Sequence, residues 1–147
     1  ALVYKKLMPI PNREDIFGKQ QIMDQEDRVI GTVENLLINA TSISFDDVFP
    51  LAASYGGIAY PAHVDKASNS LLSNLGFVPP GSSFACAEFH DFKNLHRIQK
   101  EHPYFKGCRA VCCSDAHYLW DIAEPDYQIW VESQKAADVL AALSSVI

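Results

Sequence analysis

The sequence predicts an α/β fold in which mainly parallel strands alternate with helices. Four short apolar runs are expected to be strands, at residues 57–62, 84–89, 108–113 and 128–131. Each run is apolar throughout rather than alternating, which is typical of strands buried on both faces of a parallel sheet. Helical patterns lie between or after these runs. This alternation favours a sheet that is covered on its faces or closed as a barrel.

An N-terminal β-hairpin is expected to precede this α/β part. Residues 20–23 and 28–32 flank the acidic segment 24–27, which suits a turn between two antiparallel strands. Residues 9–19 contain two prolines and a glycine among polar side chains, and we expect a loop there.

The first helix of the α/β part is expected at residues 44–55. Ser44 is followed three residues later by Asp47, which is a capping-box spacing with aspartate in place of glutamate. Gly56 is expected to end the helix. Pro50 falls inside it and is expected to kink or delay it, because proline lacks a backbone N–H and its ring clashes with the preceding turn.

Three further helical segments follow. Residues 69–74 predict a short helical turn, and residues 91–102 predict a helix that ends before Pro103. Ser133 is expected to cap the last helix. The apolar stripe of that helix consists of Ala136, Val139, Leu140 and Leu143.

Length and composition are those of one globular domain, and we expect residues 1–147 to form a single, partial one. The content of 48% hydrophobic and 20% charged residues is typical of such a domain. No apolar run reaches the roughly 18 residues of a membrane span, so no membrane association is expected. The net charge of −6 argues against binding a long nucleic-acid duplex, although bound metal ions can reverse the local field at a phosphate site.

The four cysteines favour a cytoplasmic location. Cys86 and Cys108 lie in predicted strands, and the adjacent Cys112 and Cys113 would point to opposite faces of another stretch of strand. This arrangement suits neither a disulfide framework nor a compact zinc knot. We therefore expect free thiols in a reducing compartment.

Imidazole and carboxylate groups follow three of the predicted strands. His63 comes after the first strand. Glu88 lies at the end of the second strand, and His90 follows it. Asp115 and His117 come after the third strand. The carboxyl ends of parallel strands meet at one rim, where reactive groups gather in α/β folds. These side chains are ligands for zinc, manganese or iron. The sequence therefore predicts a metal site at this rim.

Each of these residues also has a purely structural interpretation. A lone histidine after a strand is more often hydrogen-bonded or exposed than metal-bound, Glu88 could be a hydrogen-bonded acid, and Asp-x-His occurs often by chance. Two observations favour the site. Asp115 and His117 would face the same side of an extended chain, and three successive strands place candidate ligands at the same end.

Two segments resemble motifs of the PHP (polymerase and histidinol phosphatase) superfamily of metal-dependent phosphoesterases. Residues 56–63, Gly-Gly-Ile-Ala-Tyr-Pro-Ala-His, are similar to its apolar strand that runs into Ala-His. Residues 109–117 end in Ser-Asp-Ala-His and resemble its final motif. The resemblance extends roughly from Ser44 onward. It implies that the chain is the C-terminal part of a distorted (β/α)7 barrel that holds two or three zinc, manganese or iron ions.

The resemblance also implies roles for individual residues. His63, Asp115 and His117 would be metal ligands, and the last two would be catalytic. The substrate would be a phosphorylated small molecule or a nucleotide. Weaker candidates for substrate binding are Glu88, His90, Arg13 and Lys19. Lys66 is a further basic residue that could reach a phosphate.

One departure from the family pattern is important. The family's N-terminal motifs include a His-x-His pair, and this chain contains none. Three candidate ligands do not make a multinuclear centre, and half a barrel would leave open sheet edges and an uncovered apolar face. We therefore expect the missing half to come from a separate chain, from another copy of this chain or from residues upstream, and we expect the fragment alone to be inactive.

The leading hypothesis is that the intact protein is a phosphoesterase that uses metal-activated water. An alternative is a non-catalytic binding or structural module of the same fold with an incomplete metal site. A third is a nucleic-acid processing enzyme of the same superfamily, restricted by its acidic composition to short oligonucleotides or mononucleotides.

Overall fold

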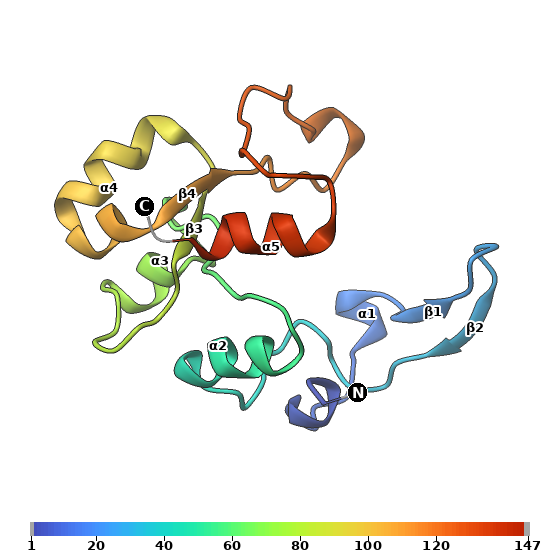
Figure 1. Ribbon diagram of the computed structural model, residues 1–147. Coiled ribbons are helices and arrows are strands. Elements are labelled where there is room, and N and C mark those ends of the chain that lie inside the picture. The colour runs from blue at the N-terminus through green and yellow to red at the C-terminus, as the bar shows by residue number, and fades with distance from the viewer. Residues whose placement is uncertain (1, 146–147) are drawn as a thin grey trace. The chain divides into compact units, whose positions relative to one another are not determined.

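A computed structural model describes residues 2–145 of the chain and shows a mixed α/β protein (Figure 1). The chain divides into two compact units, one that ends at Asp47 and one that begins at Val48. The single partial domain expected from the sequence stays a prediction. No helix among these residues has both the length and the apolar character needed to cross a membrane.

The first unit contains the predicted hairpin. Strands β1 (Gln21–Met23) and β2 (Val29–Thr32) pair in antiparallel fashion. The carboxylate of Asp24 accepts hydrogen bonds of 2.9 Å from the backbone N–H groups of Glu26 and Arg28, which closes the turn. The other elements of this unit are the 3-10 helix η1 (Tyr4–Lys6) and the short helix α1 (Glu14–Phe17).

Helix α2 (Phe45–Ser54) begins as its sequence predicts. The Ser44 hydroxyl accepts a 3.2 Å bond from the Asp47 backbone N–H and donates a 2.6 Å bond to the Asp47 carboxylate. Pro50 lies within the helix without ending it. The chain leaves the helix through Gly56, whose φ of +72° is readily adopted only by glycine.

The second unit is built around a parallel β–α–β segment (Figure 1). Strands β3 (Cys86–Phe89) and β4 (Arg109–Cys112) pair in parallel, with Cys86 opposite Arg109. They are joined by the 3-10 helix η2 (Phe92–Asn94), helix α4 (Leu95–Glu101) and the 3-10 helix η3 (Pro103–Gly107). Two predicted strands and the predicted helix are thus confirmed.

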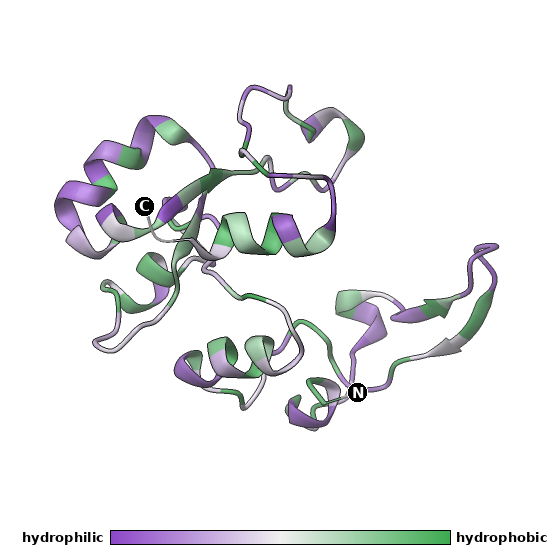
Figure 2. Cartoon of the chain, viewed as in Figure 1, coloured by the Kyte–Doolittle hydropathy of each residue, from purple (hydrophilic) through white to green (hydrophobic). Residues whose placement is uncertain are grey.

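A small apolar core lies between these elements. Phe89, Ile98 and Phe105 are almost fully buried, and the rings of Phe89 and Phe105 meet edge to face at 6.3 Å. Figure 2 shows α4 as largely hydrophilic with few apolar positions, which agrees with Ile98 being its one buried residue. The core thus fixes the two strands whose carboxyl ends carry the candidate site.

The other two predicted strands do not form regular strands, and no closed barrel is present among residues 2–145. The segment 57–62 still approaches β3, because the Glu88 N–H donates to the Pro61 carbonyl and the Val64 N–H donates to the Glu88 carbonyl. Pro61 itself has no N–H to donate, and His63 interrupts the extended backbone with a φ of +29°. Residues 128–131 do not pair with β4 in a regular ladder, although Gln128 and Ile129 line a cavity together with residues of that strand.

Two further helices complete the second unit, together with the 3-10 turn η4 (Leu119–Asp121). Helix α3 (Leu71–Leu75) lies where a helical turn is predicted and is capped by Ser70. Helix α5 (Ala136–Ser144) begins later than expected, and Ser133 does not cap it. Instead, the Ser133 hydroxyl donates to the Asp138 carboxylate and accepts from the Lys135 N–H, so it closes the turn before the helix.

Candidate functional site

The candidate site forms where two chain segments turn sharply. His63 follows the segment that approaches β3, and Asp115 follows β4. Both residues have left-handed backbone conformations, with φ of +29° and +51°. This conformation is uncommon for residues other than glycine and often marks functional turns. The two turns bring the side chains of these residues together.

One carboxylate oxygen of Asp115 is the centre of a three-residue group, which we call the Asp115 cluster and which consists of His63, Lys66 and Asp115. The Lys66 ammonium lies 2.6 Å from Oδ2 of Asp115, and Nε2 of His63 lies 3.8 Å from the same atom. The side chains are partly shielded, since that of His63 is 15% exposed and that of Asp115 is 27% exposed. A base, a cation and a carboxylate therefore share one small volume.

Electrostatics keep Asp115 ionised. The hydrogen bond from Lys66 is the main cause that holds the pKa of the Asp115 carboxyl below its ordinary value, and the positive fields of Lys66, His63 and His117 act in the same direction. Desolvation raises the pKa of Asp115, but the combined effect of these interactions is larger, so the pKa is lowered overall. Asp115 is therefore a carboxylate ready to bind a cation at neutral pH.

His63 offers a nitrogen that the fold does not use. Its Nδ1 atom is buried and has no hydrogen-bond partner among the described residues. A buried polar atom left unpaired is unfavourable and is often explained by a ligand or ion at that point. His63 thus has the chemistry of a ligand residue, with Nε2 directed at Asp115.

His117 lies next to the cluster but does not join it. Its Nδ1 is 2.8 Å from the backbone carbonyl oxygen of Asp115, and the side chain is exposed. A carbonyl can only accept, so Nδ1 must carry the proton in this contact, which leaves Nε2 as the atom with a free lone pair. Metal-binding histidines commonly hold their second nitrogen in this way.

The donor set does not amount to a complete metal site. No group of three or more histidine, cysteine, aspartate or glutamate side chains within residues 2–145 is arranged to hold a metal ion. His63 and Asp115 fit two positions of a coordination shell, whereas a zinc site requires at least three protein ligands. The two or three metal ions expected from the sequence therefore do not fit this segment alone.

The loop after His63 is fixed by Asp65. Its carboxylate accepts hydrogen bonds from the His90 N–H at 2.7 Å, the Asp91 N–H at 3.0 Å and the Asn94 side-chain amide at 2.9 Å. Burial raises the pKa of Asp65, but these hydrogen bonds together lower it by a larger amount, so the pKa lies below its ordinary value. Asp65 thereby ties the His63 loop to the turn that follows β3.

Two of the weaker candidates lie on or after β3. Glu88 is half-buried. Burial is the main cause that raises the pKa values of Tyr60 and Cys113, and the charge of Glu88 acts in the same direction. His90 is exposed, and its backbone N–H serves Asp65. The structure shows no direct contact of either side chain with the Asp115 cluster among the interactions of the described residues.

The other two weaker candidates, Arg13 and Lys19, belong to the first unit. The Arg13 guanidinium pairs with the Asp15 carboxylate at 2.6 Å, and both side chains are mostly exposed. The Asp115 cluster is made only of residues of the second unit, and a role of Arg13 and Lys19 in substrate binding stays a prediction.

The cysteines are free, as expected. Cys86 and Cys108 are buried, and burial is the main cause that raises the pKa of each thiol to about 11. Thiols are protonated at neutral pH when their pKa is so high, and only thiolates bind metals well. These two cysteines therefore support the core rather than the site.

Sequence reasoning missed two residues of this region. The strand-end pattern predicts no role for Asp65 and does not distinguish Lys66 from the other basic residues of loops. Both stand directly after the Ala-His segment, as Asp65-Lys66. That proximity to a candidate ligand was the available signal. Their partners lie far along the chain and could not be read from local pattern.

Comparison of the chain with protein-family models, with curated proteins and with solved structures finds no match.

Proposed function

We propose that the intact protein is a metal-dependent phosphoesterase of the PHP type. It would hydrolyse a phosphomonoester, or a phosphoester of a nucleotide or short oligonucleotide, with metal-activated water. The observation that supports this most is the 3.8 Å approach of His63 Nε2 to Asp115 Oδ2, two ligand-type atoms from separate turns. The four free cysteines support a cytoplasmic location as part of the proposal.

The proposed architecture is the C-terminal part of a distorted (β/α)7 barrel. Support comes from the parallel pairing of β3 with β4 and from the backbone hydrogen bonds that hold residues 61 and 64 beside β3. These three segments carry Asp115, Glu88 and His63 at or near their carboxyl ends, which is where α/β folds assemble their sites.

In this proposal His63, Asp115 and His117 bind zinc, manganese or iron. Bound metal ions would acidify a water molecule and stabilise the charge that develops on the phosphoryl group. Asp115 contributes an ionised carboxylate, and the carbonyl contact at Nδ1 of His117 orients that ring with Nε2 available. The remaining ligands would come from the N-terminal half of the barrel or from another copy of this chain.

The alternative is a binding or structural module of the same fold without catalysis. The observation that favours it is the lack of any three-donor metal group in the described part of the chain. The module would use the cluster only to stabilise its loops, and its partner binding would not depend on metal.

Metal analysis and a phosphatase assay on the same preparation separate the two functions. The phosphoesterase predicts two or three bound transition-metal ions per intact protein and hydrolysis of p-nitrophenyl phosphate. His117→Ala should reduce this activity at least about a hundredfold, the scale at which single groups act in such sites. The matched control is His96→Ala, because His96 is an exposed histidine on α4. A metal-free, inactive protein with unchanged partner binding would establish the module instead.

A further inference from the structure

We propose that Lys66 binds the phosphate group of the substrate and that Asp115 holds the lysine side chain at the site for this purpose. This inference rests on the proposed phosphoesterase function and names the residue that recognises its substrate. Lys66 differs from the other candidate basic residues in its position, because it belongs to the Asp115 cluster.

The backbone of Lys66 is held at both of its polar groups. Its N–H donates to the His63 carbonyl at 3.0 Å, and its carbonyl accepts from the Ser70 hydroxyl at 2.8 Å. Ser70 is only 2% exposed and is itself fixed as the cap of α3 through Ser73. The lysine side chain therefore starts from a rigid point, and little ordering of the loop is needed when a ligand binds.

The ammonium group retains donors for a ligand. A lysine ammonium has three N–H groups, and the interactions of the described residues use one of them, in the bond to Asp115 Oδ2. The side chain is 35% exposed, so the group can be reached from solvent. A phosphate oxygen can accept from the remaining donors while the bond to Asp115 persists.

Charge balance favours an anionic ligand beside this lysine. The chain carries a net charge of −6, so a phosphate approaching most of its surface is repelled. At the cluster, Lys66 offsets the charge of Asp115 and presents a cation to the ligand. A phosphate that binds there is therefore repelled less than at the acidic surface.

Stability alone does not explain the ion pair. Partly exposed ion pairs contribute little to folding once the entropy cost of ordering both side chains is included. The arrangement is better explained by what the ammonium does at the site. Lys66 would fix the phosphate beside His63 and Asp115 and would set the orientation of the scissile bond.

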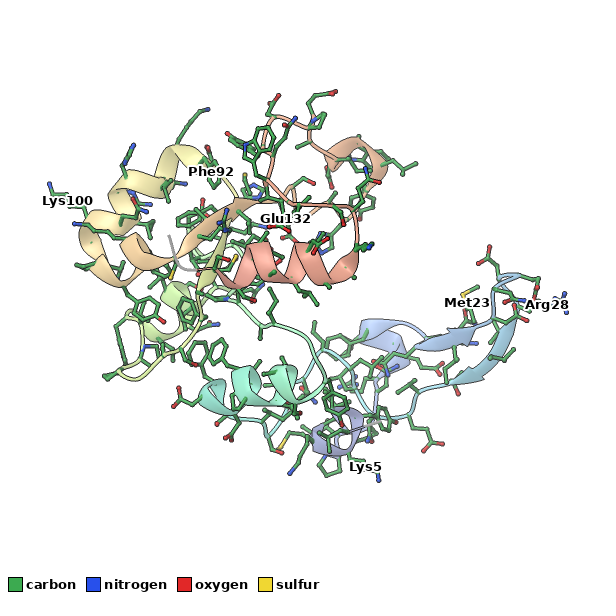
Figure 3. All side chains as sticks on the ribbon, viewed as in Figure 1. Lys5, Met23, Arg28, Phe92, Lys100 and Glu132 are labelled. Atoms are coloured by element: carbon green, nitrogen blue, oxygen red, sulfur yellow. The ribbon has the colours of Figure 1, made fainter. Side chains whose placement is uncertain are left out.

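Inorganic phosphate is the probe for the first test, with binding measured by calorimetry and by competitive inhibition of p-nitrophenyl phosphate hydrolysis. Lys66→Met should weaken phosphate binding by about tenfold or more, whereas Lys66→Arg should retain most of it because the charge and donors remain. KM should rise in Lys66→Met with metal content unchanged. The matched control is Lys100→Met, since Lys100 is exposed on α4 and points away from the second unit (Figure 3).

A second test needs no variant. Lysine acetylation of the wild-type protein, followed by mass spectrometry, should show that inorganic phosphate protects Lys66 and leaves Lys100 unprotected. Unchanged phosphate affinity in Lys66→Met, or absence of protection at Lys66, overturns the inference. If phosphate binds through Lys66 but no phosphoester is hydrolysed, the proposed function fails and the inference about Lys66 stands. If Lys66→Met hydrolyses p-nitrophenyl phosphate with an unchanged KM, the inference about Lys66 fails and the proposed function stands.

Discussion

The side chains of Asp115 and His117 show how one short motif gives two residues different chemistry. Both belong to the segment after β4, yet Asp115 is half-buried beside Lys66, whereas His117 is exposed and its ring contacts the backbone carbonyl of Asp115. Strand-end position and residue type were enough to predict His63 and Asp115 as neighbours. They did not predict that the nearest partner of Asp115 is a lysine, because that contact depends on how the loop after His63 turns back.

The buried thiols lead to a prediction about pH. Burial raises the pKa of Cys86 and Cys108 from the ordinary value of 9.0 to about 11. The folded state therefore binds these protons more tightly than the unfolded state does. Their contribution to stability is full below pH 9 and is lost as the pH rises toward 11. The urea midpoint should fall across this interval.

The matched control for the pH experiment is the variant with alanine at both buried positions, 86 and 108, whose urea midpoint should fall less between pH 9 and 11. Labelling adds a second readout. At pH 8 iodoacetamide should modify the exposed Cys113 first and should leave Cys86 and Cys108 largely unmodified. Equal labelling rates for all four cysteines would contradict the burial described above.

At the scale of elements, the sequence predicted those strands that find a regular partner. Residues 84–89 and 108–113 were identified from continuous apolar runs, and β3 and β4 form there. Residues 57–62 and 128–131 carry similar runs but lack a regular ladder, because strand formation also requires a neighbouring segment that exchanges a run of backbone hydrogen bonds with them. Pro61, with no N–H, makes such a ladder harder to complete.

The link between the His63 loop and the start of the α4 region gives the second prediction. Asp65→Ala would leave the N–H groups of His90 and Asp91 without their acceptor and should lower the free energy of unfolding by about 2–3 kcal/mol. Asp65→Asn should cost less, since one acceptor oxygen remains. Urea denaturation measures both changes.

Asp126→Ala is the control for the Asp65 variants, because Asp126 is exposed on a loop and should change stability by no more than about 0.5 kcal/mol. If Asp65→Ala were as stable as this control, the three hydrogen bonds would not hold the loop. The result would also weaken the case that His63 is positioned by this region.

At the scale of the whole molecule, apolar side chains without cover are the most evident feature. Among the described residues, Trp130 is 93% exposed, Leu119 85% and Trp120 80%, and Trp120 stacks on Tyr118 at a ring distance of 4.9 Å. Large exposed apolar surface usually marks an interaction site. Among the described residues β4 forms a regular ladder only with β3, so another chain could extend the other edge of β4.

The third prediction concerns this surface. The chain by itself should self-associate, and sedimentation should show an average mass that increases with protein concentration. Trp130→Ser should reduce the association, because it removes the most exposed large side chain. The control is Ser68→Ala, a small change at an exposed polar residue, which should not affect the association. A monomer at every concentration would mean that the surface needs no partner.

The two left-handed residues at the site have an implication for protein engineering. His63 and Asp115 hold backbone conformations that glycine adopts more easily. Directed evolution for heat resistance alone would therefore favour glycine at both positions and would discard the imidazole and the carboxylate together. A screen that seeks a sturdier version of this protein should therefore retain a functional readout in every round.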